Sequence, residues 1–190
     1  MRRSLVIAVA AAVSTLAGCG SSAPPAAAPP PPATSAVASP DASAAPAAPD
    51  AAPGSAVPGV PALTGTPTDV TKASQAKAGA GQPPGKLVTQ DVVVGKGTAA
   101  TLSNTVNVRY TGTLYSDGTL FDSSWSHGDA PVSFPLDGVV PGFAQGIAGM
   151  QPGGRRVIVI PPALGYGNTD NGPIPAGSTL VFVVDLVGVS

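Results

Sequence analysis

The chain has 190 residues, a formal net charge of −1 and one cysteine. A single cysteine excludes an intramolecular disulfide, and a near-neutral chain without a basic run lacks the electrostatic footprint of a nucleic-acid-binding protein. The sequence also has no cysteine–histidine cluster and no metal-ligand spacing, so we expect neither a metal nor a cofactor.

The first 18 residues have the pattern of an export signal. Met1–Arg3 is a short positive stretch, and the apolar run Leu5–Leu16 is shorter than the roughly 20 residues that cross a bilayer as a helix. The run ends in Leu-Ala-Gly-Cys19, which resembles the lipobox of bacterial lipoproteins. That resemblance implies cleavage before Cys19, a lipid on its sulfur, and anchoring to the outer face of the bacterial cytoplasmic membrane. The alternatives are an uncleaved signal anchor and an ordinary signal peptide with a chance cysteine.

Residues 19–85 differ sharply in composition from the rest of the chain. They are rich in proline and alanine, whereas every aromatic residue of the chain lies between Tyr110 and Phe182. A segment with so few large apolar side chains buries too little surface to offset the entropy lost on ordering. We therefore predict a disordered or polyproline-like tether over residues 19–85 and one folded domain over residues 86–190.

The folded part begins with patterns typical of strands. Leu87–Val94 is predicted to be a strand, and Thr105–Leu114 alternates apolar and polar residues, as a half-buried strand does. Asp117-Gly118 favours a tight turn. Leu120–Ser123 then returns as the second strand of a hairpin.

One helix is predicted in the middle of the domain, between further strands. Pro141 suits the first turn of a helix, and Val140, Phe143 and Ile147 follow at helical spacing before Gly149 ends the run. The remaining pattern predicts three strands and a loop: Val132–Leu136, Arg155–Ile160, the loop Pro161–Ser178, and Thr179–Val189. The Arg155-Arg156 pair is interpreted as surface cations. The predicted class is α+β, with a curved antiparallel sheet over one short helix.

The predicted hairpin brings chemically distinct side chains together. Tyr110 supplies a phenol, Phe121 an apolar ring and Asp122 a carboxylate, on two strands that the Asp117-Gly118 turn connects. Such a group is a candidate binding site, although these residues do not identify its ligand. Trp125 either contacts a ligand at the rim of the site or packs its loop onto the domain. His127 is interpreted as an exposed loop residue.

The domain resembles the FK506-binding-protein family of peptidyl-prolyl cis/trans isomerases. The resemblance rests on an ordered series of motifs: Val108-Arg-Tyr-Thr-Gly112, Phe121-Asp-Ser-Ser124, Pro141-Gly-Phe143, Gly153-Gly-Arg155, Tyr166-Gly167, Ile174-Pro175 and Thr179-Leu-Val-Phe182. It implies the family's fold and a proline-isomerising enzyme that forms no covalent intermediate. It also implies Pro-containing polypeptides as substrates and macrolides of the FK506 and rapamycin type as ligands.

The resemblance assigns roles to individual residues. Tyr110, Asp122 and Tyr166 would be catalytic, and the substrate-binding residues would be Phe121, Phe134, Val139, Val140, Phe143, Ile174 and Phe182. Tyr166 would donate a hydrogen bond to a substrate carbonyl, and so would the Ile174 backbone N–H. Phe143 departs from the pattern, because the best-known members have tryptophan at this position, on the floor of the pocket.

Two classes of function remain open. The first is an isomerase that accelerates proline-limited folding of exported proteins. The alternative is a non-catalytic module that binds Pro-containing segments, or a chaperone, through the same pocket.

Overall fold

The computed structural model describes residues 57–128 and 130–190. The predicted signal peptide, Cys19 and the predicted tether up to residue 56 lie outside these residues. No helix in the described part of the chain is long and apolar enough to cross a membrane.

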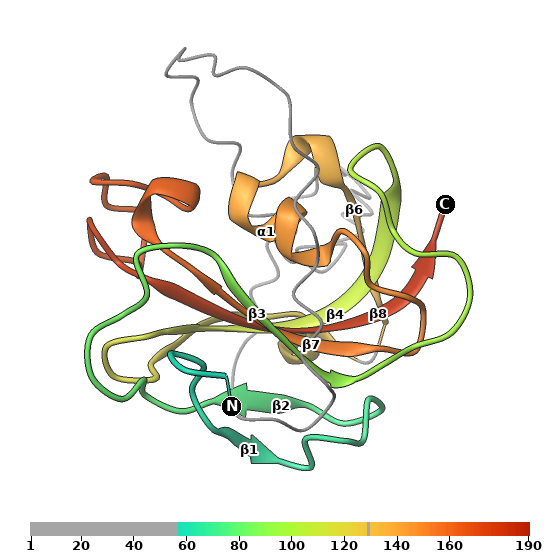
Figure 1. Cartoon of the computed structure of the whole chain (residues 1–190), viewed down its shortest axis with the longest axis horizontal. Coiled ribbons are helices and arrows are strands. Elements are labelled where there is room, and N and C mark those ends of the chain that lie inside the picture. The colour runs from blue at the N-terminus through green and yellow to red at the C-terminus, as the bar shows by residue number, and fades with distance from the viewer. Residues whose placement is uncertain (1–56, 129) are drawn as a thin grey trace, which may run out of the picture.

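A six-stranded antiparallel sheet forms the centre of the domain (Figure 1). Its strands are β3 (Val88–Val93), β4 (Thr105–Leu114), β5 (Leu120–Ser123), β6 (Val132–Pro135), β7 (Arg155–Ile160) and β8 (Leu180–Val189). They are arranged in the order β3-β7-β8-β4-β5, and β6 pairs with β4. These strands and the single α-helix among the described residues confirm the predicted α+β class.

Helix α1 (Pro141–Ile147) packs across one face of the sheet, which we call the inner face (Figure 1). Pro141 opens it without losing a needed N–H donor. Two glycines allow a close approach: a Cβ on Gly142 would lie 2.3 Å from Ile160 Cγ2, and one on Gly146 would lie 2.4 Å from Ile158 Cγ2. Three short 3-10 helices complete the domain: η1 (Ser124–His127), η2 (Leu136–Gly138) and η3 (Pro162–Leu164).

The opposite, outer face of the sheet is covered by residues 57–85, which we call the strap. Within it, β1 (Leu63–Gly65) and β2 (Ser74–Ala76) form a small hairpin that lies below the main sheet in Figure 1. Ala76 is buried there with Tyr115, Val157, Val159 and Val181. The prediction that the whole of residues 19–85 is a disordered tether is therefore wrong for residues 57–85.

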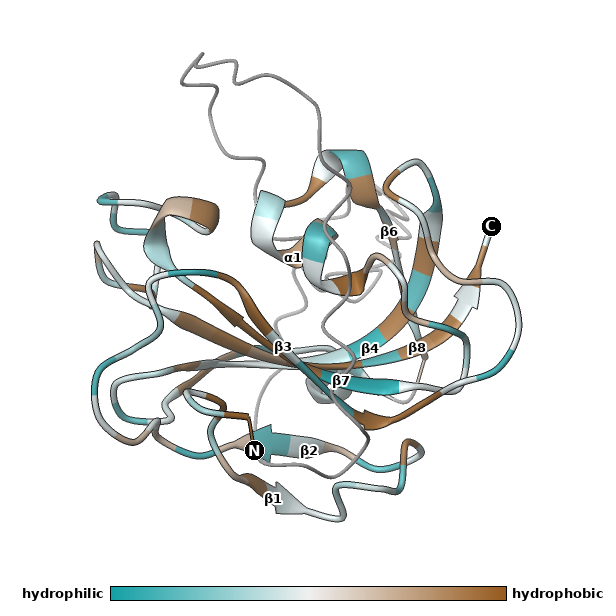
Figure 2. Cartoon of the chain, viewed as in Figure 1, coloured by the Kyte–Doolittle hydropathy of each residue, from teal (hydrophilic) through white to brown (hydrophobic). Residues whose placement is uncertain are grey.

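The physical reason for this difference is in the central strands. Figure 2 shows long hydrophobic stretches along them, and Val157, Ile158, Val159 and Ile160 are all at most 1% exposed. Successive residues of a strand point to opposite faces, so both faces of β7 need a cover. Helix α1 covers one, and the strap covers the other.

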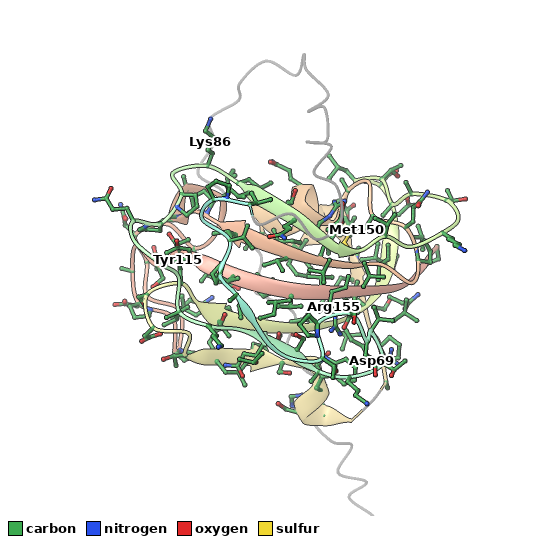
Figure 3. All side chains as sticks on the ribbon, turned by 60° about the horizontal axis from the view of Figure 1, so that its bottom comes forward. Asp69, Lys86, Tyr115, Met150 and Arg155 are labelled. Atoms are coloured by element: carbon green, nitrogen blue, oxygen red, sulfur yellow. The ribbon has the colours of Figure 1, made fainter. Side chains whose placement is uncertain are left out.

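Arg155 fastens the strap to the sheet. It is fully buried, and its guanidinium pairs with Asp185 on β8, with 2.7 Å from Nη2 to Oδ2. The same guanidinium donates to three strap carbonyls, those of Thr66 (3.1 Å), Pro67 (3.1 Å) and Lys72 (2.7 Å). Figure 3 shows the strap crossing in front of the sheet from Tyr115 toward Arg155 and Asp69. Burial raises the pKa of the Asp185 carboxyl, and the Arg155 guanidinium opposes that rise.

Arg156 has a different role on the inner face. Its Nε and Nη2 atoms donate to the carboxylate of Asp91 on β3, at 2.6 and 2.9 Å. Its Nη1 donates to the carbonyls of Gly146 and Ala148, which lie at the C-terminal end of α1. A cation at this end of a helix satisfies carbonyls that have no partner within the helix. Neither arginine is a free surface cation, so that prediction is wrong.

Candidate active site

Tyr110 and Asp122 meet across the β4–β5 hairpin. The Tyr110 hydroxyl donates a hydrogen bond of 2.6 Å to Asp122 Oδ2. Tyr110 is 1% exposed, whereas Asp122 is partly exposed. The carboxylate therefore faces solvent while a buried phenol holds one of its oxygens.

The two serines after Asp122 fix the hairpin in place. Ser124 Oγ accepts a hydrogen bond of 2.9 Å from the backbone N–H of Tyr110. Ser123 is the N-cap of η1, and its side chain accepts from the Trp125 N–H. The Phe-Asp-Ser-Ser sequence thus supplies one ring and one carboxylate to the site, followed by two hydroxyls that hold its backbone.

Phe121 lies against Phe182, with the ring centroids 5.5 Å apart and the planes at 84°. The ring occupies the space above Gly112 on β4: a Cβ there would lie 2.7 Å from Phe121 and 2.9 Å from Phe182. The glycine of the Tyr-Thr-Gly sequence is thus required by the close approach of two rings.

Behind these residues lies a cluster of four aromatic rings. Phe143 on α1 contacts Phe182 at 5.1 Å, Phe134 at 6.1 Å and Tyr110 at 6.3 Å between centroids. The rings meet edge to face or tilted, which is the favourable geometry for aromatic pairs. Phe134, Phe143 and Phe182 are at most 2% exposed, and Val140 is fully buried.

Burial divides the predicted substrate-binding residues, together with the predicted catalytic residues Asp122 and Tyr166, into two groups. Phe134, Val140, Phe143 and Phe182 have almost no accessible surface and form the backing of the site, and Ile174 is also buried. The partly exposed group consists of Phe121, Asp122, Val139 and Tyr166. A ligand that approaches this structure meets the second group first.

Both tyrosines of the site keep their protons over a wide pH range. Burial raises the pKa of Tyr166 to about 12, and the Asp122 carboxylate contributes in the same direction. Burial and the hydrogen bond to Asp122 raise the pKa of Tyr110 well above its usual value. Each hydroxyl is therefore a hydrogen-bond donor near neutral pH, and the charge of Asp122 acts on both.

Among the described residues, no group of three or more His, Cys, Asp or Glu side chains is arranged to hold a metal ion. The arrangement consists of apolar rings, two phenols and one carboxylate. It suits a reaction that changes the geometry of a bound apolar group.

Comparison with known proteins places this arrangement in a family. A family model described as FKBP-type peptidyl-prolyl cis-trans isomerase matches residues 96–187. The chain is 43% identical over 107 residues to the probable FK506-binding protein of Corynebacterium glutamicum, a match that covers 56% of this chain and 90% of the relative. The chain belongs to this family.

Three further comparisons agree with the FKBP assignment. FkpA of Escherichia coli K12, an FKBP-type peptidyl-prolyl cis-trans isomerase, is 50% identical over 103 residues, which are 54% of this chain and 37% of FkpA. The crystal structure of E. coli FkpA superimposes with a TM-score of 0.52 at 49% identity, over 55% of this chain and 48% of that one. The crystal structure of AtFKBP13 gives a TM-score of 0.50 at 34% identity, over 55% and 93%.

The structure bears on two further predictions for this FKBP domain. The Ile174 N–H, predicted to serve a substrate carbonyl, donates instead to Asn171 O at 3.0 Å within its own loop. Trp125 stacks under the Arg109 guanidinium, 5.4 Å from its ring centroid. Because Arg109 adjoins Tyr110 on β4, it points to the opposite face. The indole is therefore associated with the outer face, away from Tyr110.

Proposed function

We propose that this FKBP-type isomerase accelerates the cis/trans isomerisation of X–Pro bonds in exported proteins. The observation that carries the proposal is the partly exposed Asp122 carboxylate, held by the Tyr110 phenol beside Phe121 at the edge of an aromatic cluster. Membership of the isomerase family supports the reaction type.

The chemistry of the reaction matches these groups. Rotation about a peptide bond crosses a barrier of about 18–20 kcal/mol because resonance keeps the amide planar. The twisted state has less resonance and a smaller dipole than the planar amide. An apolar surface that excludes water therefore favours the twisted state relative to the planar one. Only the partial double bond is lost and remade, so no covalent intermediate forms.

Each accessible group has a separate task in this proposal. Phe121 and Val139 contact the proline ring, and the buried rings behind them keep that surface rigid. The Tyr166 hydroxyl donates a hydrogen bond to a substrate carbonyl, since its pKa of about 12 keeps it protonated. Asp122 faces the carbonyl carbon as the peptide plane turns.

Refolding of a protein whose slow phase is limited by proline isomerisation tests the activity. The purified full chain should increase the rate of that phase at catalytic concentrations, and an FK506-type macrolide should suppress the increase. A chain that binds Pro-containing peptides without changing this rate would support the binding-module or chaperone alternative and refute catalysis.

We also propose that the domain acts outside the cytoplasmic membrane, attached through a lipid on Cys19. The support is the Leu-Ala-Gly-Cys19 sequence after an apolar run, followed by a Pro/Ala-rich segment. Labelled fatty acid should enter the full chain expressed in a bacterium and be absent from a Cys19→Ala variant. Equal labelling of the two would contradict the anchor.

A further inference from the structure

The strap reaches the turn between β4 and β5. The Gly79 N–H donates to Tyr115 O at 2.7 Å, and the Tyr115 hydroxyl donates to Ala80 O at 3.3 Å. Gly79 lies directly on the Tyr115 ring: a Cβ there would be 2.1 Å from Tyr115 Cζ. Gly79 of the strap therefore packs against Tyr115, the first residue of the turn, so closely that a larger residue at position 79 would displace the ring.

A second contact lies on the other side of the same turn. The Gln75 side-chain amide donates to Gly118 O at 3.2 Å. Gly118 also faces the strap closely, because a Cβ there would lie 2.7 Å from Ala78 N. The strap thus binds the turn at both its first residue and its tip.

The turn leads directly into the strand that carries the site. β5 lies at one edge of the sheet and pairs with β4 at three positions, with a register shift between Gly112 and Thr113. Phe121 and Asp122 are the second and third residues of this short strand. The C-terminal end of this short edge strand is held by Ser124 and by the Tyr110–Asp122 hydrogen bond, so the contacts to its turn matter for the position of its other end.

The other end of the strap is fixed to the centre of the sheet. The fully buried Arg155 holds the carbonyls of Thr66, Pro67 and Lys72, and Thr111 Oγ1 on β4 donates to Ser74 O at 2.6 Å. A segment attached at both ends transmits the position of the sheet to the turn. The family model matches from residue 96, so the strap precedes the matched region.

We propose that the strap is a positioning element of the active site: Gln75, Gly79 and Tyr115 hold the β4–β5 turn, and the turn holds Phe121 and Asp122. The inference rests on the proposed isomerase function. Because catalysis depends on placement within about an ångström, where a misplacement costs about 10²-fold, loosening the turn should lower the rate without unfolding the sheet.

The test uses the full chain with three variants and one control. Gly79→Ala forces Tyr115 to move, Gln75→Ala removes the bond to Gly118, and Tyr115→Phe removes the bond to Ala80. Gly85→Ala is the control, since a Cβ at this position of the strap meets nothing within 4 Å. The measurements are kcat/KM for a proline peptide, amide hydrogen exchange by segment, and thermal unfolding.

We expect Gly79→Ala to reduce kcat/KM about tenfold, which is less than the roughly 10²-fold loss expected for a misplacement of one ångström. Gln75→Ala and Tyr115→Phe should reduce kcat/KM by a smaller factor. Exchange should increase in residues 115–124 and stay unchanged in β7 and β8. Gly85→Ala should match the wild type in all three measurements.

Unchanged kcat/KM in Gly79→Ala and Gln75→Ala would overturn the inference. So would an increase in exchange spread evenly over the sheet, because the strap would then contribute only to stability. If Gly79→Ala does not fold, Gln75→Ala and Tyr115→Phe decide by the same criteria. A wild-type chain without isomerase activity would refute the proposed function instead, and hydrogen exchange would still show whether the strap holds the turn.

Discussion

The inner face of the sheet has four aromatic rings among aliphatic side chains and the Arg156–Asp91 pair at the end of α1. The outer face has valines, the single ring of Tyr115 and the fully buried Arg155, paired with Asp185. Under α1, Tyr110, Phe134, Phe143 and Phe182 contact one another. Under the strap, valines of β7 and β8 pack with Leu63 and Ala76 of the strap and with Tyr115. The two covers therefore differ in chemistry.

The difference lies in where each face keeps polar groups. On the outer face, the buried Arg155 guanidinium donates hydrogen bonds to Asp185 and to strap carbonyls. On the inner face, Asp122 binds Tyr110 and remains partly exposed at the edge of the sheet. We therefore expect outer-face substitutions to change mainly the free energy of unfolding, and substitutions at the inner edge to change mainly the rate.

The largest expected effect is that of Arg155→Met. The variant leaves Asp185 buried without its partner and removes the Arg155 donor from three strap carbonyls, of which Thr66 O still accepts from the Asp69 N–H. The free energy of unfolding should therefore fall by about 3–5 kcal/mol. Urea unfolding measures the change. Lys72→Met is the matched control, because its side chain is 66% exposed in a surface pair with Asp69 and should contribute less than about 1 kcal/mol. Equal effects of the two variants would show that the outer face is not anchored by Arg155.

The outer cover explains what could not be predicted from sequence. The strap has short strands of small and polar residues, and Arg155 holds it through backbone carbonyls, which every residue has. Its composition therefore resembles that of a disordered tether. The indication that the outer face is covered comes instead from the central strands, because Arg155–Ile160 and Leu180–Leu186 are buried at every position. Near-continuous apolar strands indicate a sheet covered on both sides.

The inner face was more predictable, because its signals are local. The alternation in β4, the Asp117-Gly118 turn and Pro141 at the start of α1 are present in the sequence, and the structure has the corresponding hairpin and helix. The exposure of individual rings was not predictable, since it depends on packing between segments distant in sequence. Phe143, predicted as a pocket floor, is 1% exposed.

A smaller effect on the inner face is expected from Phe143→Leu. Leucine retains an apolar side chain but loses ring contacts with Tyr110, Phe134 and Phe182, each worth about 0.5–1.5 kcal/mol. We expect a loss of about 1.5–4 kcal/mol in unfolding free energy and a moderate fall in kcat/KM, because the backing of the site becomes less rigid. Thermal unfolding and the peptide assay measure both. Unchanged stability would mean that these ring contacts do not support the inner face.

Asp122→Asn should separate rate from stability. The amide has the shape of the carboxylate and still accepts from Tyr110, so unfolding free energy should change by less than about 1 kcal/mol. Losing the charge should lower kcat/KM about tenfold, equivalent to about 1.4 kcal/mol of transition-state stabilisation. A stability loss as large as that of Arg155→Met, with no loss of rate at low temperature, would reverse the proposed contrast between the two faces.

The smallest expected effect is a pH dependence at the inner edge. Burial and Asp122 raise the pKa of Tyr166 to about 12 in the folded chain, above the ordinary value of 10.0. Above pH 10 the unfolded chain therefore loses this proton first, so stability falls as pH rises from 10 to 12 and is unaffected below 10. The loss from Tyr166 is small, because solvent screens a side chain that is only half-buried, and Tyr110 adds to it in the same direction. Tyr166→Phe should show a shallower decline than the wild type in urea unfolding between pH 9 and 11. Parallel declines would mean that the Tyr166 hydroxyl is not half-buried near Asp122. The site would then lack the hydroxyl that donates to a substrate carbonyl in the proposed reaction.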